Sequence, residues 1–99
     1  MAFRIIYSPE ALEHLAELPK ATQALVVDQV DEQLANEPAR PTRKRKLLRP
    51  NPIAPWVLRL GDIRVFYDVR ESPEPVVGIA AVGVKQHNEL WFGKEKINL

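Results

Sequence analysis

Hydrophobic residues follow two different periods along this chain. Before residue 37 they recur three or four positions apart, which is typical of one face of an amphipathic helix. From residue 56 onward they alternate with polar residues, which is typical of strands with one buried face. The intervening residues 37–55 contain five prolines, which is typical of a loop. The pattern therefore predicts helices in the first part of the chain and a sheet in the second.

The helical part follows a short predicted strand over residues 3–7. Ser8 is a suitable N-cap for a helix whose first position is Pro9, and Pro19 ends that helix. The leucines predicted to face inward are spaced three apart: Leu12, Leu15 and Leu18. His14 lies off this stripe among acidic residues, and we expect it at the surface.

A second helix is predicted over residues 20–36, where the next prolines stop it. The residues predicted to face inward are Val27, Val30 and Leu34. Because only a short break at Pro19 separates the two helices, we expect them to pack as an antiparallel helical hairpin.

The strongest strand signal is the pair of alternating segments at residues 56–60 and 63–69. The two residues between them, Gly61 and Asp62, predict a tight hairpin turn. With that turn, six apolar side chains share one face of the hairpin, which we expect to be the core beneath the helices: Trp56, Leu58, Leu60, Ile63, Val65 and Tyr67.

The same register places Arg59 directly opposite Arg64 on the other face. Like charges in directly opposed positions destabilise a sheet, by up to about 1 kcal/mol. An anion bound between the two guanidinium groups would remove that repulsion. The alternative is that both side chains are solvated and splayed, or that Asp62 or Asp68 neutralises them.

Two further elements complete the predicted sheet. Residues 76–84 are nearly all apolar, which predicts an inner strand covered on both faces. A short helical or extended element is expected around residues 88–92. The fold class is thus α+β in one domain over residues 1–99, with the order β-α-α-β-β-β and the helical hairpin on one face of an antiparallel-rich sheet.

The composition fits a globular protein, with 45% hydrophobic and 27% charged residues. The chain has no cysteine, which excludes disulfide scaffolds, thiol nucleophiles and thiolate metal sites, and suits the cytoplasm. No apolar run approaches the roughly 20 residues that span a bilayer, so no membrane contact is expected. Nothing in the sequence indicates a metal or another cofactor.

The net charge of +1 conceals a strong asymmetry. Residues 40–70 carry nine basic side chains against Asp62 and Asp68, whereas residues 1–39 carry seven acids against Arg4 and Lys20. The basic residues of the central loop are Arg40, Arg43, Lys44, Arg45, Lys46 and Arg49. Such a concentration of positive charge attracts phosphate backbones or acidic protein segments, although charge runs are also common on solvated surfaces.

Two segments, Trp56 to Val69 and Ala81 to Trp91, resemble the RelE/ParE superfamily of bacterial type II toxins, and so does the order of the elements. The resemblance implies a small toxin that a cognate antitoxin neutralises. RelE-like members enter the ribosomal A site and cut mRNA there without a metal, whereas ParE-like members poison DNA gyrase.

The resemblance also assigns roles to single residues. Arg64 matches the arginine that contacts the scissile phosphate, and Arg59 and Lys85 match basic positions of the same site. Val57 stands where RelE-like members usually have a second basic residue, and Trp91 stands where many have a tyrosine. The implied catalytic set, with His87 added as a general acid or base near this site, is Arg59, Arg64, Lys85 and His87.

The residues expected to bind RNA are Arg43, Lys44, Arg45, Lys46 and Arg49 of the loop, with Trp91 stacking on a base. Two alternatives stay open here: His87 is a surface residue of the tail, and Trp91 and Phe92 are core side chains that fasten the tail to the sheet.

The sequence therefore indicates a toxin that acts as a metal-independent, ribosome-dependent mRNA endoribonuclease. Its expected partners are a cognate antitoxin, the ribosome and mRNA. The alternatives are a gyrase-inhibiting toxin that cuts no RNA, and a degenerate toxin that only binds its antitoxin.

Overall fold

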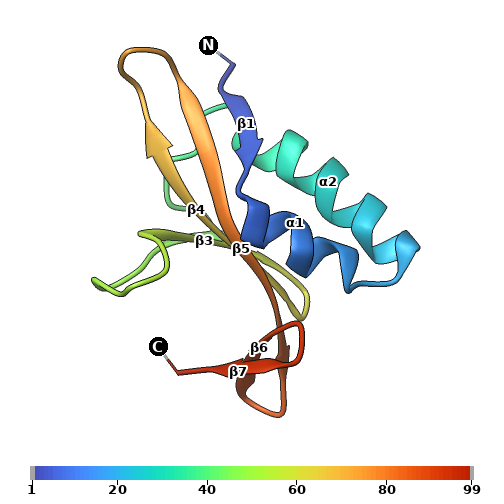
Figure 1. The fold of residues 1–99 in the computed structure, drawn as a ribbon. Coiled ribbons are helices and arrows are strands. Elements are labelled where there is room, and N and C mark those ends of the chain that lie inside the picture. The colour runs from blue at the N-terminus through green and yellow to red at the C-terminus, as the bar shows by residue number, and fades with distance from the viewer. Residues whose placement is uncertain (1, 99) are drawn as a thin grey trace.

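The computed structural model describes residues 2–98 and places two helices on one face of a twisted sheet (Figure 1). The helices are α1 (Pro9–Ala16) and α2 (Lys20–Leu34). The strands are β1 (Arg4–Tyr7), β2 (Arg45–Leu47), β3 (Trp56–Leu60), β4 (Ile63–Arg70), β5 (Val76–Gln86), β6 (Glu89–Phe92) and β7 (Glu95–Ile97). The α+β class and the helical pair on one face are confirmed.

The sheet is built around the long strand β5. The antiparallel order runs β2-β3-β4-β5-β6-β7, and β1 pairs in parallel with the first part of β5. Strand β6 pairs with the last residues of β5, so β1 and β6 share one edge of it. The predicted inner strand is thus confirmed, and it extends two residues further, to Gln86.

Neither helix within residues 2–98 has the length and apolar character needed to cross a bilayer.

The β3–β4 hairpin has the predicted register. Leu60 lies opposite Ile63, Arg59 opposite Arg64, and Trp56 opposite Tyr67. Gly61 takes a positive φ of 59°, which a glycine adopts without strain in a tight turn. The six apolar side chains predicted for the helix face belong to its core, five of them buried and Leu60 packed at its margin.

The helices begin as predicted but present slightly different faces. The Ala11 N–H donates to Ser8 Oγ at 3.0 Å, which confirms the cap. Leu12, expected inside, is 53% exposed, and the smaller Ala11 is buried in its place against the sheet. In α2, Val26 is buried and Val27 only half-buried. The other inward predictions are confirmed, because Val30 and Leu34 are buried and Leu15 and Leu18 pack against the main core.

A second, smaller core on the opposite face of the sheet was not predicted. It contains Ala54, Val57, Phe66, Ala81 and Phe92. The Phe66 and Phe92 rings meet edge to face with centroids 5.6 Å apart. Phe92 is thus a core side chain, which confirms that alternative for this residue.

The end of the chain forms a strand hairpin, so the helical alternative for residues 88–92 is wrong. The β5–β6 turn consists of His87 and Asn88, both with positive φ. Asparagine tolerates this left-handed conformation better than most residues, and two such residues suit a tight hairpin turn.

The central segment contains a strand that the prolines concealed. Strand β2 pairs with β3 through Arg45–Leu58, Lys46–Val57 and Leu47–Trp56. Arg45 therefore belongs to the helix face of the sheet, and only 9% of its surface is exposed. Its guanidinium donates to the backbone carbonyls of Gln33 (2.7 Å), Asn36 (3.2 Å) and Glu37 (3.1 Å), the carbonyls at and just beyond the C-terminus of α2. The expectation that Arg45 binds RNA is thus wrong, because its side chain is buried and its Nη1 already donates to three carbonyls inside the protein.

We expect Arg45→Ala to destabilise the fold by about 3 kcal/mol, because buried carbonyls at the helix terminus lose a charged donor. The neighbouring Lys44 has an exposed side chain, and Lys44→Ala should change the free energy of unfolding by less than about 0.5 kcal/mol. Urea denaturation of the two variants measures the difference. Equal stabilities would contradict the role of Arg45 as a helix cap.

Candidate functional site

A shallow groove on the sheet face opposite the helices gathers four basic side chains. It has a volume of about 360 Å³. Its cations are Lys46, Arg59, Arg64 and Lys85, and its apolar residues are Leu48, Val57, Phe66 and Leu90. Three of the four residues expected to carry out catalysis, Arg59, Arg64 and Lys85, are thus brought together from separate strands.

Strand alternation and pairing position these cations. Arg59 lies between Leu58 and Leu60, which face the helices, so its own side chain faces the groove. Lys85 pairs with Leu90 across β5 and β6, and its N–H donates to the carbonyl of Asp62 at 2.7 Å. That bond ties the end of β5 to the β3–β4 turn.

Lys46 is a groove residue whose position the sequence did not reveal. It lies opposite Val57 on β2, and both line the groove. Val57 is the position at which a cation was missing by resemblance, so Lys46 supplies a positive charge beside it from the neighbouring strand. Alternation along β2 could have predicted this position, because Arg45 and Leu47 belong to the helix face and Lys46 between them belongs to the groove face. The flanking prolines instead favoured a loop interpretation of this segment.

The two opposed arginines have no carboxylate partner within residues 2–98. The ion pairs there join Arg4 with Glu74, Arg40 with Glu37, and Lys96 with Glu89. The Arg64 guanidinium instead donates to the carbonyls of Gly61 and Ile63, the latter at 3.0 Å. Partial burial, and then the charge of Arg59, lower the pKa of Arg64 from its ordinary value, while Asp62 opposes the shift. Among residues 2–98, no acidic side chain lines the groove, so its positive charge has no ion-pair partner there.

The other predicted residues lie outside the groove. Trp91 pairs with Val84 and lines a different cleft on the helix side, so it is not placed to stack on a base bound beside the arginines. His87 is exposed in the β5–β6 turn and does not line the groove. Arg43, Lys44 and Arg49 are exposed on the segments that flank β2.

His14, expected at the surface, joins α1 to the sheet. Its Nδ1 accepts the Val82 N–H at 3.2 Å, and its ring stacks on Phe92 with centroids 4.8 Å apart. Burial lowers the pKa of His14 from 6.5, and the nearby carboxylates of Glu13, Glu10 and Glu95 partly oppose this. The neutral imidazole is the form that accepts the bond from Val82.

Comparison with known proteins places this geometry in a family. The family model described as the ParE toxin of type II toxin-antitoxin system, parDE, matches residues 5–88. The chain belongs to this toxin family. The match covers the helices, the β3–β4 hairpin and all four groove cations. No curated protein matches the chain.

A solved structure supports the same assignment. The toxin-antitoxin complex RelBE2 from Mycobacterium tuberculosis contains a chain that is 25% identical to this one, with a TM-score of 0.73. The similarity covers 85% of this toxin and 92% of that chain. The protein is therefore a type II toxin of the RelE/ParE family, and the resemblance seen in the sequence is confirmed.

We expect His14 to make the stability of this toxin pH-dependent. Its folded pKa lies below 6.5, so the unfolded chain takes up the proton first as the pH falls. The contribution of His14 is therefore complete above about pH 6.5 and is lost as the pH falls from there toward the folded pKa.

His14→Gln keeps an acceptor for the Val82 N–H but does not titrate in this range. Denaturation at several values between about pH 8 and pH 5 should show a shallower loss of stability in the variant than in the wild type. Parallel pH profiles would contradict this account.

Proposed function

We propose that this toxin is an mRNA endoribonuclease that acts on the ribosome and holds the scissile phosphate in the basic groove. The observation that carries the proposal is the opposed pair Arg59 and Arg64, which faces the groove without a carboxylate within ion-pair distance in residues 2–98. A phosphate between the two guanidinium groups would convert a repulsive pair into two charge-assisted contacts.

The reaction that fits these groups is an attack of the 2′-hydroxyl on the adjacent phosphorus. The bond from phosphorus to the 5′-oxygen breaks, the 2′-hydroxyl loses a proton, and the leaving oxygen gains one. Positive groups around the phosphate stabilise the additional negative charge of the transition state. The lining residues include no carboxylate or imidazole that would hold a metal, which supports a mechanism driven by the protein's own cations.

Proton donation to the leaving oxygen falls to the lysines in this proposal. Arginine stays protonated in proteins, whereas a lysine amine can accept or donate a proton. Lys46 and Lys85 are the two lysines that line the groove, one on β2 and the other on β5. We assign the donation of a proton to the 5′-oxygen to one of these ammonium groups, while the 2′-hydroxyl proton passes to water and both lysines stabilise the charge of the transition state.

The exposed basic residues beside the groove support ribosome dependence. Arg43, Lys44 and Arg49 flank β2, and no acidic side chain pairs with them in the described part of the chain. Contacts of this kind bind an RNA backbone without regard to sequence. We therefore propose that they contact ribosomal RNA in the cytoplasm and place the groove over the mRNA.

A second candidate function is gyrase inhibition without RNA cleavage. The family model that matches this chain describes the ParE toxin. In addition, no histidine is among the residues that line the groove, and Trp91, which was expected to stack on a base, lies outside it. Both observations favour a toxin that binds a protein target. Induction experiments separate the two functions because one stops translation and the other damages DNA.

The test is induced expression of the wild type and of the variants Arg59→Ala, Arg64→Ala and Lys46→Ala. The wild type should inhibit translation and produce new mRNA ends within translated reading frames. Each arginine variant should reduce cleavage by about 100-fold or more, because a group that stabilises transition-state charge is lost. The control Lys94→Ala removes one exposed positive charge outside the groove and should stay within about twofold of the wild type.

Unchanged mRNA ends with continuing translation would overturn the nuclease proposal. Induction of the DNA-damage response, with stalled gyrase–DNA complexes, would then establish the second candidate. Full toxicity in all three groove variants would show that the groove contacts no phosphate.

A further inference from the structure

A second hollow lies on the helix side of the sheet, away from the basic groove. It is a cleft of about 610 Å³ between the α1–α2 junction and the C-terminal strands. Its apolar lining consists of Leu18, Pro19, Ile63, Val82, Val84 and Trp91. The polar lining includes Glu17 and Asp62 but no lysine or arginine. The proposed nuclease reaction uses none of these residues.

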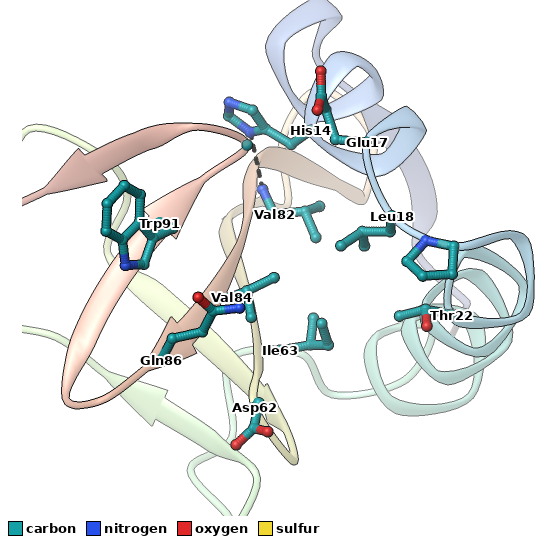
Figure 2. A pocket seen from close by; sticks show the side chains of 12 residues that line it. His14, Glu17, Leu18, Thr22, Asp62, Ile63, Val82, Val84, Gln86 and Trp91 are labelled. Carbon is teal, nitrogen blue, oxygen red and sulfur yellow. Dashed lines mark hydrogen bonds between the residues drawn. The ribbon is translucent and has the colours of Figure 1, made fainter.

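Figure 2 shows how the walls are arranged. Trp91 forms one wall and Leu18 and Thr22 the other, while Val84 and Ile63 lie between them. The two carboxylates lie at opposite ends, with Glu17 beside His14 and Asp62 at the β3–β4 turn. The cleft is thus an apolar channel with a negative charge at each end.

Neither carboxylate forms an ion pair within residues 2–98, although the charge of Asp62 also acts on Arg64 of the neighbouring groove. Glu17 is the C-cap residue of α1, where the helix dipole makes a negative charge unfavourable. Its side chain extends along the β6–β7 turn, where a Cβ added to Gly93 would lie 3.6 Å from Glu17 Cγ. An incoming cation would offset both the dipole and the lack of a partner.

Trp91 adds a second means of binding a cation. Its indole is half-buried on β6 and faces this cleft rather than the sheet face that carries the arginines. A lysine or arginine side chain can lie across an indole while its charged end reaches a carboxylate. A phosphate chain would instead meet the negative charges of Glu17 and Asp62 here, with no lysine or arginine among the lining residues, so RNA is a poor occupant.

We propose that this cleft binds a segment of the cognate antitoxin in which lysine or arginine residues flank apolar side chains. The apolar side chains fill the channel, and the basic ones meet Glu17 and Asp62 at its two ends. Complementary charge selects this segment, whereas the basic groove on the other face favours an acidic one. The inference rests on the toxin family and stands whether the toxic activity is RNA cleavage or gyrase inhibition.

The test uses the full-length antitoxin and measures its dissociation constant for the purified toxin. Glu17→Gln combined with Asp62→Asn keeps the shapes of both side chains and removes both charges. This double variant should bind at least tenfold more weakly and show a smaller salt dependence, because two desolvated charge pairs are lost. Trp91→Ala should weaken binding by a similar factor.

Two controls keep the result interpretable. Glu13→Gln removes an exposed carboxylate of the same helix that does not line the cleft, and its affinity should stay within twofold of the wild type. Thermal denaturation checks that each variant is folded. The toxicity of Glu17→Gln alone and of Trp91→Ala without antitoxin should equal that of the wild type, because these two side chains face away from the groove.

Wild-type affinity in both the double variant and Trp91→Ala would overturn the proposal. So would a loss of free-toxin activity with antitoxin binding intact, because the cleft would then belong to the toxin's target. Neither result would affect the groove variants, so failure of this inference is distinguishable from failure of the proposed nuclease.

Discussion

The register of β3 against β4 is the constraint on which the rest of the molecule depends. A two-residue turn at Gly61 and Asp62 fixes it, and the alternation of side chains then assigns every hairpin residue to one face. A slip of one residue would place Arg59 in the core beneath the helices and Leu58 in the groove. Because burying an unpaired arginine is far more costly than any gain from an alternative pairing, the register is strongly specified.

That register gives the two faces of the sheet different chemistry. The helix face holds the main core, and the other face combines a smaller core around Phe66 with the basic groove. The apolar residues at the groove floor hold the strands in place without neutralising the cations. A rigid sheet of this kind can keep like charges close together, because the cost of their repulsion is small compared with the stabilisation from the two cores.

Basic residues that are adjacent in the chain serve different purposes here. Arg45 faces the helices and binds the carbonyls at the end of α2, whereas Lys46 faces the groove. The first stabilises the attachment of β2 to the helical layer, and the second adds to the positive charge of the site. The same positive charge therefore has a structural role on one face of β2 and a candidate functional role on the other.

The sequence by itself determined the helical hairpin, the β3–β4 register, the opposed arginines and the toxin family, because each depends on short-range periodicity, on turn chemistry or on a contiguous motif. Only the tertiary structure decided which cations meet: it buried Arg45, brought Lys46 beside Val57 and placed Trp91 in the cleft on the opposite face from the groove. These outcomes depend on the pairing of β2 and β6, two short strands whose positions are set by long-range packing. A local pattern records which way a side chain alternates, but not which neighbour the strand will have.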